Sequence, residues 1–275
     1  MITSPDQNPP SLTELAGSPP LHLPAGRLDG RICLVVGATS GIGHATALRM
    51  AKEGAAAVVV AGRRQALGEA LAEALRRAGT QGLFVAADVT READLARLVE
   101  ETMARFGRLD TVFNNAGFQE RRAPLADQTD AVYQQVFDTN VRAVFNAMRH
   151  QVPAIIASGG GAIVNNTSVS GIRNPNPGLS LYSASKAAAI SLTRAAAMEY
   201  AQSGVRINAV APGRVVTDMM LASGIADMRA VGAGLPLRRM GHPEEVAAAV
   251  VWLLSQEASF IVGHVLSADG GFLAG

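Results

Sequence analysis

The sequence predicts an α/β fold, a single doubly wound domain with a parallel sheet of about seven strands and helices on both faces. Short, almost continuous apolar runs alternate with longer helical patterns, and a glycine-rich turn joins the first run to an Ala-rich helix. Strands buried on both faces read as continuous apolar runs, and their alternation with helices is typical of parallel sheets. We therefore expect ligands to bind at the carboxyl ends of the strands.

The individual elements follow from these patterns in chain order. The apolar runs predict strands at residues 32–36, 56–61, 83–87, 111–114, 162–166, 206–210 and 265–267. The helical patterns predict helices at about residues 42–53, 65–78, 92–106, 129–157, 183–202 and 244–254. Pro243 suits the first turn of the last helix. No internal repeat or long linker divides residues 29–275, which indicates one domain.

Composition narrows the class of protein. The chain has 275 residues, of which 48% are hydrophobic and 17% charged, as in a packed globular protein. A net charge of +1 and an aromatic content of 4% give no basis for nucleic-acid binding. The Pro-rich residues 1–28 predict a flexible N-terminal tail or a surface-docked arm.

Other features concern compartment and metals. The single cysteine, Cys33, lies in an apolar run, so we interpret it as a small buried side chain rather than a nucleophile. It allows no internal disulfide, which fits a reducing compartment, and we expect a cytoplasmic protein. No apolar run approaches the ~18 residues of a membrane span, and no secretory signal precedes the domain. The five histidines are scattered without metal-ligand spacing, so we expect no metal.

The turn after the first strand is a predicted phosphate-binding site. Glycines there allow a tight turn and a close approach to a pyrophosphate, and the following helix N-terminus offers free N–H groups. A glycine turn can also be a mere connection, but its place between a strand and a helix favours a dinucleotide. The residues expected to bind it are Gly37, Thr39, Ser40, Gly41, Ile42 and Gly43.

The end of the second strand indicates which dinucleotide binds. NAD sites use an acidic residue here to bind the adenosine ribose, but residues 58–64 contain none. Arg63 and Arg64 could pair instead with a 2′-phosphate, a group that a guanidinium suits. The alternative is that both arginines are solvated surface. The sequence therefore favours NADP(H) as the cofactor, with NAD(H) possible.

Tyr182 and Lys186 form the most informative pair. Residues four apart on a helix are neighbours on one face. An ammonium beside a phenol favours the phenolate, so we expect Lys186 to lower the pKa of Tyr182. Such a phenol can exchange a proton with an alcohol or an alkoxide. By itself the spacing also fits a chance surface pair.

In their order along the chain, these motifs resemble the short-chain dehydrogenase/reductase superfamily in its single-domain form, a Rossmann-like NAD(P)-binding fold. The resemblance covers about residues 29–273. Two departures stand out: Val36 replaces a frequent threonine, and Ser40 stands where some NADP-dependent relatives have a basic residue. The matching motifs are the turn 37–43, Asp88-Val89, residues 114–117, Asn140, Ser168, Tyr182 with Lys186, Pro212-Gly213, Thr217 and residues 268–272.

The resemblance implies four catalytic residues. Tyr182 is the general acid or base, Lys186 lowers its pKa and bonds the nicotinamide ribose, and Ser168 stabilises the substrate oxygen. Asn140 holds a water that links Lys186 to solvent, or, alternatively, is a helix-interior asparagine bonded to backbone. The gap from Ser168 to Tyr182 is one residue longer than in many relatives, so Ser170 is a second candidate for the serine.

The resemblance also implies further cofactor contacts. Asp88 accepts from the adenine amino group, beside Val89, and the segment after the sixth strand contacts the nicotinamide carboxamide. The residues so implied are Asp88, Val89, Asn114, Ala116, Gly117, Pro212, Gly213, Val215 and Thr217.

The function predicted is hydride transfer between NADP(H) and a small-molecule carbonyl or secondary alcohol, as in a carbonyl reductase. Substrate identity is expected in residues 118–124, 170–181 and 219–239. A 3-oxoacyl-(acyl carrier protein) reductase is an alternative, ranked lower because residues 151–161 contain no Lys or Arg to dock an acidic carrier. A non-catalytic dinucleotide-binding protein, or another reaction on the same fold, is less favoured. Family analogy implies a homotetramer.

Overall fold

The computed structural model describes residues 26–174, 176–223, 225 and 227–275. Most of the predicted tail therefore lies outside the described residues. Of its last three residues, Leu28 packs in the core with 1% of its surface exposed, and its backbone N–H donates to Glu53 over 2.8 Å. The chain is thus anchored to the domain one residue before the predicted boundary.

Seven parallel strands form one sheet in the order β3-β2-β1-β4-β5-β6-β7, which confirms the predicted fold class. The order reverses direction between β1 and β4, and this is where doubly wound sheets bind ligands. The strands are β1 (Ile32–Val36), β2 (Ala57–Gly62), β3 (Gln81–Ala86), β4 (Thr111–Asn114), β5 (Gly161–Asn166), β6 (Val205–Pro212) and β7 (Val265–Ala268).

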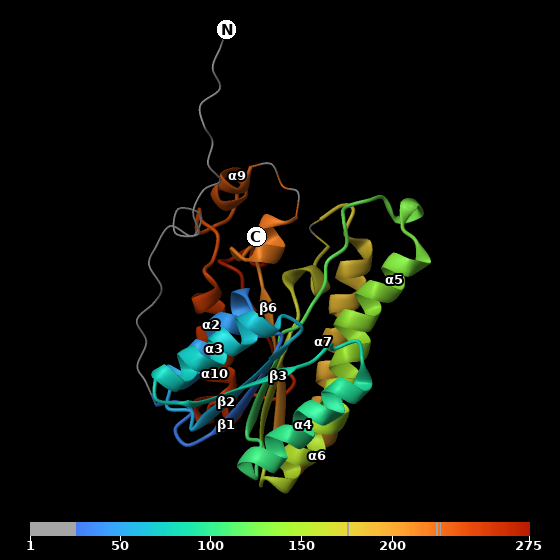
Figure 1. Cartoon of the computed structure of the whole chain (residues 1–275). Helices are drawn as coiled ribbons and strands as arrows, with labels where there is room; N and C mark the ends of the chain where they lie inside the picture. The colour runs from blue at the N-terminus through green and yellow to red at the C-terminus, as the bar shows by residue number, and fades with distance from the viewer. Residues whose placement is uncertain (1–25, 175, 224, 226) are drawn as a thin grey trace.

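Helices cover both faces of the sheet (Figure 1). On one face lie α2 (Gly41–Lys52), α3 (Gln65–Arg77) and α10 (Pro243–Leu254). On the other lie α4 (Glu92–Phe106), α6 (Ala143–Ala157) and α7 (Ser180–Tyr200), and α5 (Asp130–Phe137) continues along α7. The two short helices α8 (Asp218–Leu221) and α9 (Met228–Ala233) were not predicted from the sequence.

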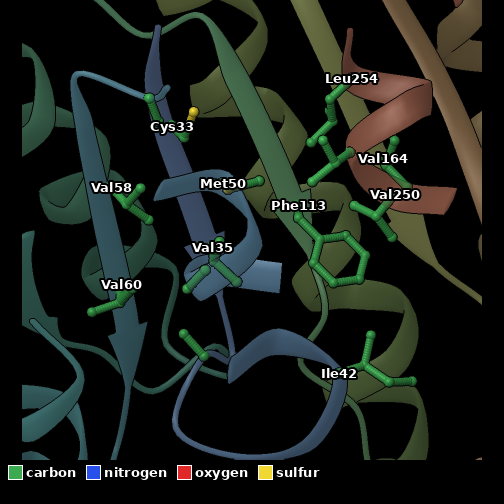
Figure 2. Packing of buried hydrophobic residues seen from close by; sticks show 14 of the residues in the cluster. Cys33, Val35, Ile42, Met50, Val58, Val60, Phe113, Val164, Val250 and Leu254 are labelled. Carbon is green, nitrogen blue, oxygen red and sulfur yellow. The ribbon is translucent and has the colours of Figure 1, made fainter. Parts of the chain in front are cut away.

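The alternation of side chains along β1 explains this layering. Cys33 and Val35 belong to the core cluster beneath α2 and α10, whereas Leu34 and Val36 belong to the cluster beneath α4 and α6. Successive strand residues point to opposite faces, so a strand between two helical layers must be apolar throughout. Figure 2 shows the first cluster, in which Val35 lies among residues from neighbouring strands and helices.

Cys33 is fully buried in this cluster, and burial raises the pKa of its thiol to about 12. It is therefore a core side chain, as the sequence predicts. Within the described residues, none of the helices combines the length and apolarity that a membrane span needs.

The long helix predicted at residues 129–157 is interrupted. A π-helical turn at Asp138–Arg142 separates α5 from α6, and it contains Asn140. Such turns add one residue to an α-helix and occur often at functional sites. The hydrophobic pattern runs through this break because both flanking helices have a buried side, so the sequence reads as one helix.

The segment of the chain that connects β6 to α10 forms a small hydrophobic core of its own. Val216, Met228 and Met240 are each buried in it, apart from the two main clusters. In the segment 219–239, which is expected to determine the substrate, α8 and α9 pack around this apolar cluster.

Candidate active site

A cavity of about 450 Å³ opens at the carboxyl edge of the sheet. Its walls come from the segments after β1, β2, β3, β4, β5 and β6 and from the first two turns of α7. The register aligns the last residues of the central strands, with Val36 opposite Asn114 and Asn114 opposite Asn165. The volume falls within the range of small-molecule sites.

The cavity gathers most of the residues that the sequence singles out. Gly43, Asn114 and Asn140 do not line it. The predicted residues that do line it are Gly37, Thr39, Ser40, Gly41, Ile42, Arg63, Arg64, Asp88, Val89, Ala116, Gly117, Ser168, Tyr182, Lys186, Pro212, Gly213, Val215 and Thr217. The second candidate serine, Ser170, lines it too.

Two glycines fix the shape of the turn after β1. Gly37 has φ +85°, and a Cβ there would lie 2.6 Å from the backbone nitrogen of Ala116. A Cβ at Gly43 would lie 2.2 Å from the carbonyl oxygen of Gly37. No side chain fits at either place. The turn is therefore pressed against the loop after β4, and the N-terminus of α2 faces the cavity, as an anion-binding turn requires.

Charged and hydroxyl groups gather beside this turn. The guanidinium of Arg64 donates to Thr39 Oγ1 over 2.9 Å and to Ser40 Oγ over 2.6 Å. Burial tends to raise the pKa of Asp88, but hydrogen bonds from Thr90 and the charge of Arg63 together lower it. Arg63 and Arg64 are both exposed at the cavity wall. This arrangement places a cationic, hydroxyl-rich surface at the end of β2 beside the glycine turn.

A chain of amides connects the glycine turn to Lys186. Asn115 Nδ2 donates to the Gly37 carbonyl over 2.6 Å, and Asn166 Nδ2 donates to Asn115 Oδ1 over 2.9 Å. Lys186 Nζ then donates to the Asn166 carbonyl over 2.8 Å. Asn115, which the motif at residues 114–117 includes without a role, and Asn166, which the sequence analysis did not single out, therefore both join the cavity wall to Lys186.

The signal for them was a pair of asparagine doublets at the ends of β4 and β5. The first members of the doublets turn away from the cavity: Asn114 Nδ2 donates to Gln151 and to Asn165, over 2.9 Å each. Because adjacent strand residues face opposite sides, the second members line the cavity. Asn114 thus supports the strand ends from the core.

Tyr182 and Lys186 meet in the cavity as the helical spacing predicts. Lys186 Nζ lies 5.7 Å from the centroid of the Tyr182 ring. Burial lowers the pKa of Lys186 to about 8, because desolvation disfavours the ammonium. Burial also raises the pKa of Tyr182, and a hydrogen bond with Ser168 opposes that rise. The pKa of Tyr182 is therefore raised, mainly by burial, which is opposite in direction to the lowering expected from Lys186.

Asn140 reaches this group from the π-helical turn. Its Oδ1 accepts from the Phe118 N–H over 2.8 Å, and its Nδ2 donates to the Phe118 carbonyl over 2.8 Å and to Ser185 Oγ over 2.9 Å. A Cβ at Gly117 would lie 3.4 Å from Lys186 Nζ and 3.5 Å from Asn140 Oδ1. Asn140 Oδ1 and Lys186 Nζ thus both lie beside Gly117, and the Asn140 amide is bonded mainly to backbone.

Glu120 is a buried carboxylate that the sequence analysis missed. It is 3% exposed, and its Oε1 accepts from the backbone N–H of Tyr182 over 3.0 Å in the first turn of α7. Its Oε2 is buried without a hydrogen-bond partner among the described residues. A carboxylate at a helix N-terminus is stabilised by the helix dipole. Its charge also raises the pKa of Tyr182.

Glu120→Gln is expected to lower the pKa of Tyr182. The amide keeps an acceptor for the Tyr182 N–H but removes the negative charge that opposes phenolate formation. For alcohol oxidation, which requires the phenolate, the acidic limb of the kcat/KM profile is expected to move to lower pH. Glu199→Gln, on the exposed last turn of α7, is the matched control. An unchanged or alkaline-shifted profile would contradict the electrostatic role of Glu120.

Comparison with known proteins agrees with this geometry. A family profile described as enoyl-(acyl carrier protein) reductase matches residues 37–273. The A-factor type gamma-butyrolactone 1'-reductase (1S-forming) of Streptomyces virginiae is 42% identical over 250 residues, which cover 90% of this chain and 97% of the relative. The cis-4-hydroxycyclohexanecarboxylate dehydrogenase of Sinomonas cyclohexanicum is 43% identical over 247 residues, covering 89% and 97%.

A solved structure supports the same assignment. The crystal structure of levodione reductase superposes with a TM-score of 0.86 at 35% identity, covering 90% of this chain and 99% of that chain. The fold, the cavity and these relatives together establish an enzyme that uses a nicotinamide dinucleotide and acts on CH–OH or C=O groups of small molecules. This chain belongs to the short-chain dehydrogenase/reductase superfamily.

Proposed function

We propose that the protein transfers hydride between NADP(H) and a ketone or secondary alcohol carried on a small ring, with Tyr182 as the general acid or base. The observation that carries the proposal is the meeting of Tyr182, Ser168 and Lys186 in the cavity that the glycine turn also lines. The two relatives described above are named for a butyrolactone and a cyclohexanecarboxylate, which supports a ring compound.

The cofactor, when bound, supplies or accepts the hydride, and the protein handles the proton. In reduction, Tyr182 gives its phenolic proton to the substrate oxygen, while Ser168 donates a hydrogen bond to that oxygen as negative charge develops. In oxidation, the phenolate of Tyr182 takes the proton of the alcohol. Lys186 stabilises the phenolate in this burial-disfavoured state, because an adjacent positive charge offsets part of the desolvation cost.

Three features support NADP(H) over NAD(H). Neither Arg63 nor Arg64 has a carboxylate partner in an ion pair among the described residues. Arg64 is held against two hydroxyls of the glycine turn. No acidic residue follows β2 to accept hydrogen bonds from a ribose. A 2′-phosphate would complete this set of donors.

A 3-oxoacyl-(acyl carrier protein) reductase is the second candidate, because the description of the matching family names an acyl carrier protein, although for an enoyl reductase. The absence of Lys and Arg from residues 151–161 counts against docking of an acidic carrier there. For Tyr182 and its partners, the proton chemistry would be the same.

The experiment that tests the proposal is a substrate panel read by dinucleotide absorbance. Cyclic ketones, cyclic alcohols, open-chain ketones and a 3-oxoacyl thioester are each offered with NADPH or NADH, or with the oxidised forms for alcohols. We expect the highest kcat/KM with a ring compound and NADP(H). Thioester turnover alone would favour the second candidate, and no turnover would reject hydride transfer to these classes.

We also propose a homo-oligomer, by family analogy a tetramer, in the cytoplasm. Large apolar side chains are exposed on α6, α7 and the chain before β7, where Phe145, Met198 and Phe260 are 46%, 79% and 98% exposed. Burial of such side chains against a second copy would stabilise an assembly. Light scattering of the purified chain is expected to give four times 28.5 kDa, and a monomer mass would reject the proposal.

A further inference from the structure

Arg214 is a charged residue in the cavity that neither the motifs nor the proton chemistry requires. It lies two residues after the end of β6, lines the cavity and is half-buried. Its guanidinium donates to Asn176 Oδ1 and lies 5.9 Å from the ring of Phe272. An amide and a ring are neutral partners, so both contacts orient the guanidinium without neutralising it.

No carboxylate in the described part of the chain forms an ion pair with Arg214. Burial lowers the pKa of Arg214, and the neighbouring charge of Arg122 lowers it further. A guanidinium nevertheless stays protonated in proteins. A partly desolvated cation without a counter-charge is destabilising, and an anion arriving from solvent would remove that cost.

The position of Arg214 assigns this anion to the substrate rather than to the cofactor's 2′-phosphate. Its charge acts on Tyr182, whose pKa it lowers, whereas Arg63 acts on Asp88 and Arg64 is bonded to the glycine turn. A short polar chain also connects it to the proposed serine. Asn176 donates to Ser170 Oγ over 3.5 Å, and the Ser170 N–H donates to Ser168 Oγ over 3.1 Å.

We propose that Arg214 binds a carboxylate on the substrate, so that the enzyme acts on a ketone or alcohol bearing an acid group away from the reacting carbon. This inference rests on the proposed hydride-transfer function. A carboxylate fits better than a phosphate dianion because Arg214 offers one guanidinium: of the other cations that line the cavity, Arg63 and Arg64 lie beside Asp88 and the glycine turn, and Lys186 donates to the Asn166 carbonyl. Arg122, the neighbour of Arg214, does not line the cavity, and its guanidinium donates to the Pro177 carbonyl over 3.0 Å.

The test compares a charged and a neutral form of one ring ketone, 4-oxocyclohexanecarboxylate and its methyl ester, with NADPH. The readout is the ratio of their kcat/KM values, because a general effect on folding or turnover cancels in it. The wild type is expected to favour the acid, and Arg214→Gln is expected to lower the ratio about ten- to hundredfold, the loss of a charged hydrogen bond. Arg214→Lys should restore part of it.

Arg173→Gln is the matched control. Arg173 lies 5.5 Å from the same Phe272 ring but is exposed and does not line the cavity. If Arg214 served only to hold Phe272, both variants would act alike on the two substrates. A wild type without preference for the acid, or an equal change of the ratio in Arg173→Gln and Arg214→Gln, would overturn the proposal.

A binding measurement separates this inference from the proposed function. Calorimetry of cyclohexanecarboxylate, which has no group to reduce, is run on the wild type and both variants. Binding that weakens tenfold or more only in Arg214→Gln supports the anion site even if no ketone turns over. Turnover of the neutral ester without carboxylate binding would leave hydride transfer standing and reject the role of Arg214.

Discussion

Replacing Tyr182 with phenylalanine is expected to lower kcat about 10²- to 10⁴-fold, the usual contribution of a general acid or base. The phenyl ring fills the same space beside Lys186, but it carries no proton to exchange with the substrate oxygen. Ser168 loses its hydrogen-bond partner, because phenylalanine has no hydroxyl group. Affinity for the dinucleotide should change little, because the glycine turn and Arg64 remain in place.

The measurement pairs turnover with cofactor binding. Steady-state rates give the loss in kcat, and fluorescence titration with NADPH gives the Kd. Tyr133→Phe is the control, since Tyr133 is 47% exposed and stacks on Phe137, outside the cavity. A Tyr182→Phe enzyme within tenfold of wild-type kcat would remove Tyr182 from the proton transfer.

The double variant Arg63→Ala plus Arg64→Ala is expected to weaken NADPH more than NADH, by ~1.5–3 kcal/mol, or about ten- to 150-fold. The difference arises because only NADPH carries the 2′-phosphate that the two guanidinium groups would bind. Loss of Arg64 also removes its hydrogen bonds to Thr39 and Ser40. The glycine turn is then less constrained, so the affinity for NADH should fall slightly. Titration of each cofactor gives the two Kd values directly.

An arginine far from the cavity provides the control for this test. Arg77→Ala, at the exposed far end of α3 and away from the cavity, removes one positive charge without touching the site. It should change both affinities by little, since a distant exposed charge is screened by salt. Equal weakening of NADPH and NADH in the double variant would reject a 2′-phosphate site.

The layered fold was predictable because its signal is carried by many residues at once. All five residues of β1, Ile32–Val36, are buried, so none of them can be polar, and the resulting apolar run predicts the strand. The sequence predicts the boundaries of other strands less well. β3 begins at Gln81, two residues before the predicted start, because backbone pairing with β2 includes Gln81 and Gly82. Pairing of backbone groups leaves no mark on composition.

The sequence predicted those parts of the site that lie at a fixed spacing on one helix. It did not predict those that folding brings together from different elements. Tyr182 and Lys186 lie on one helix, so their approach follows from helical geometry. Glu120 and Arg214 come from two loops, and only the folded chain brings both charges to bear on Tyr182. The same folding buries the phenol, which is why the direction of its pKa shift could not be foreseen from the pair alone.

The extra residue of the π-helical turn has a consequence for how this gene could vary. An α-helix turns about 100° per residue, so deleting one residue from 138–142 would produce a more regular helix and rotate α5 against α6 by that angle. Either Asn140 would swing away from Phe118, or α5 would lose its packing on α7. A deletion of one residue here would therefore leave a regular helix, but the rotation would break the contacts that hold Asn140 or α5 in place.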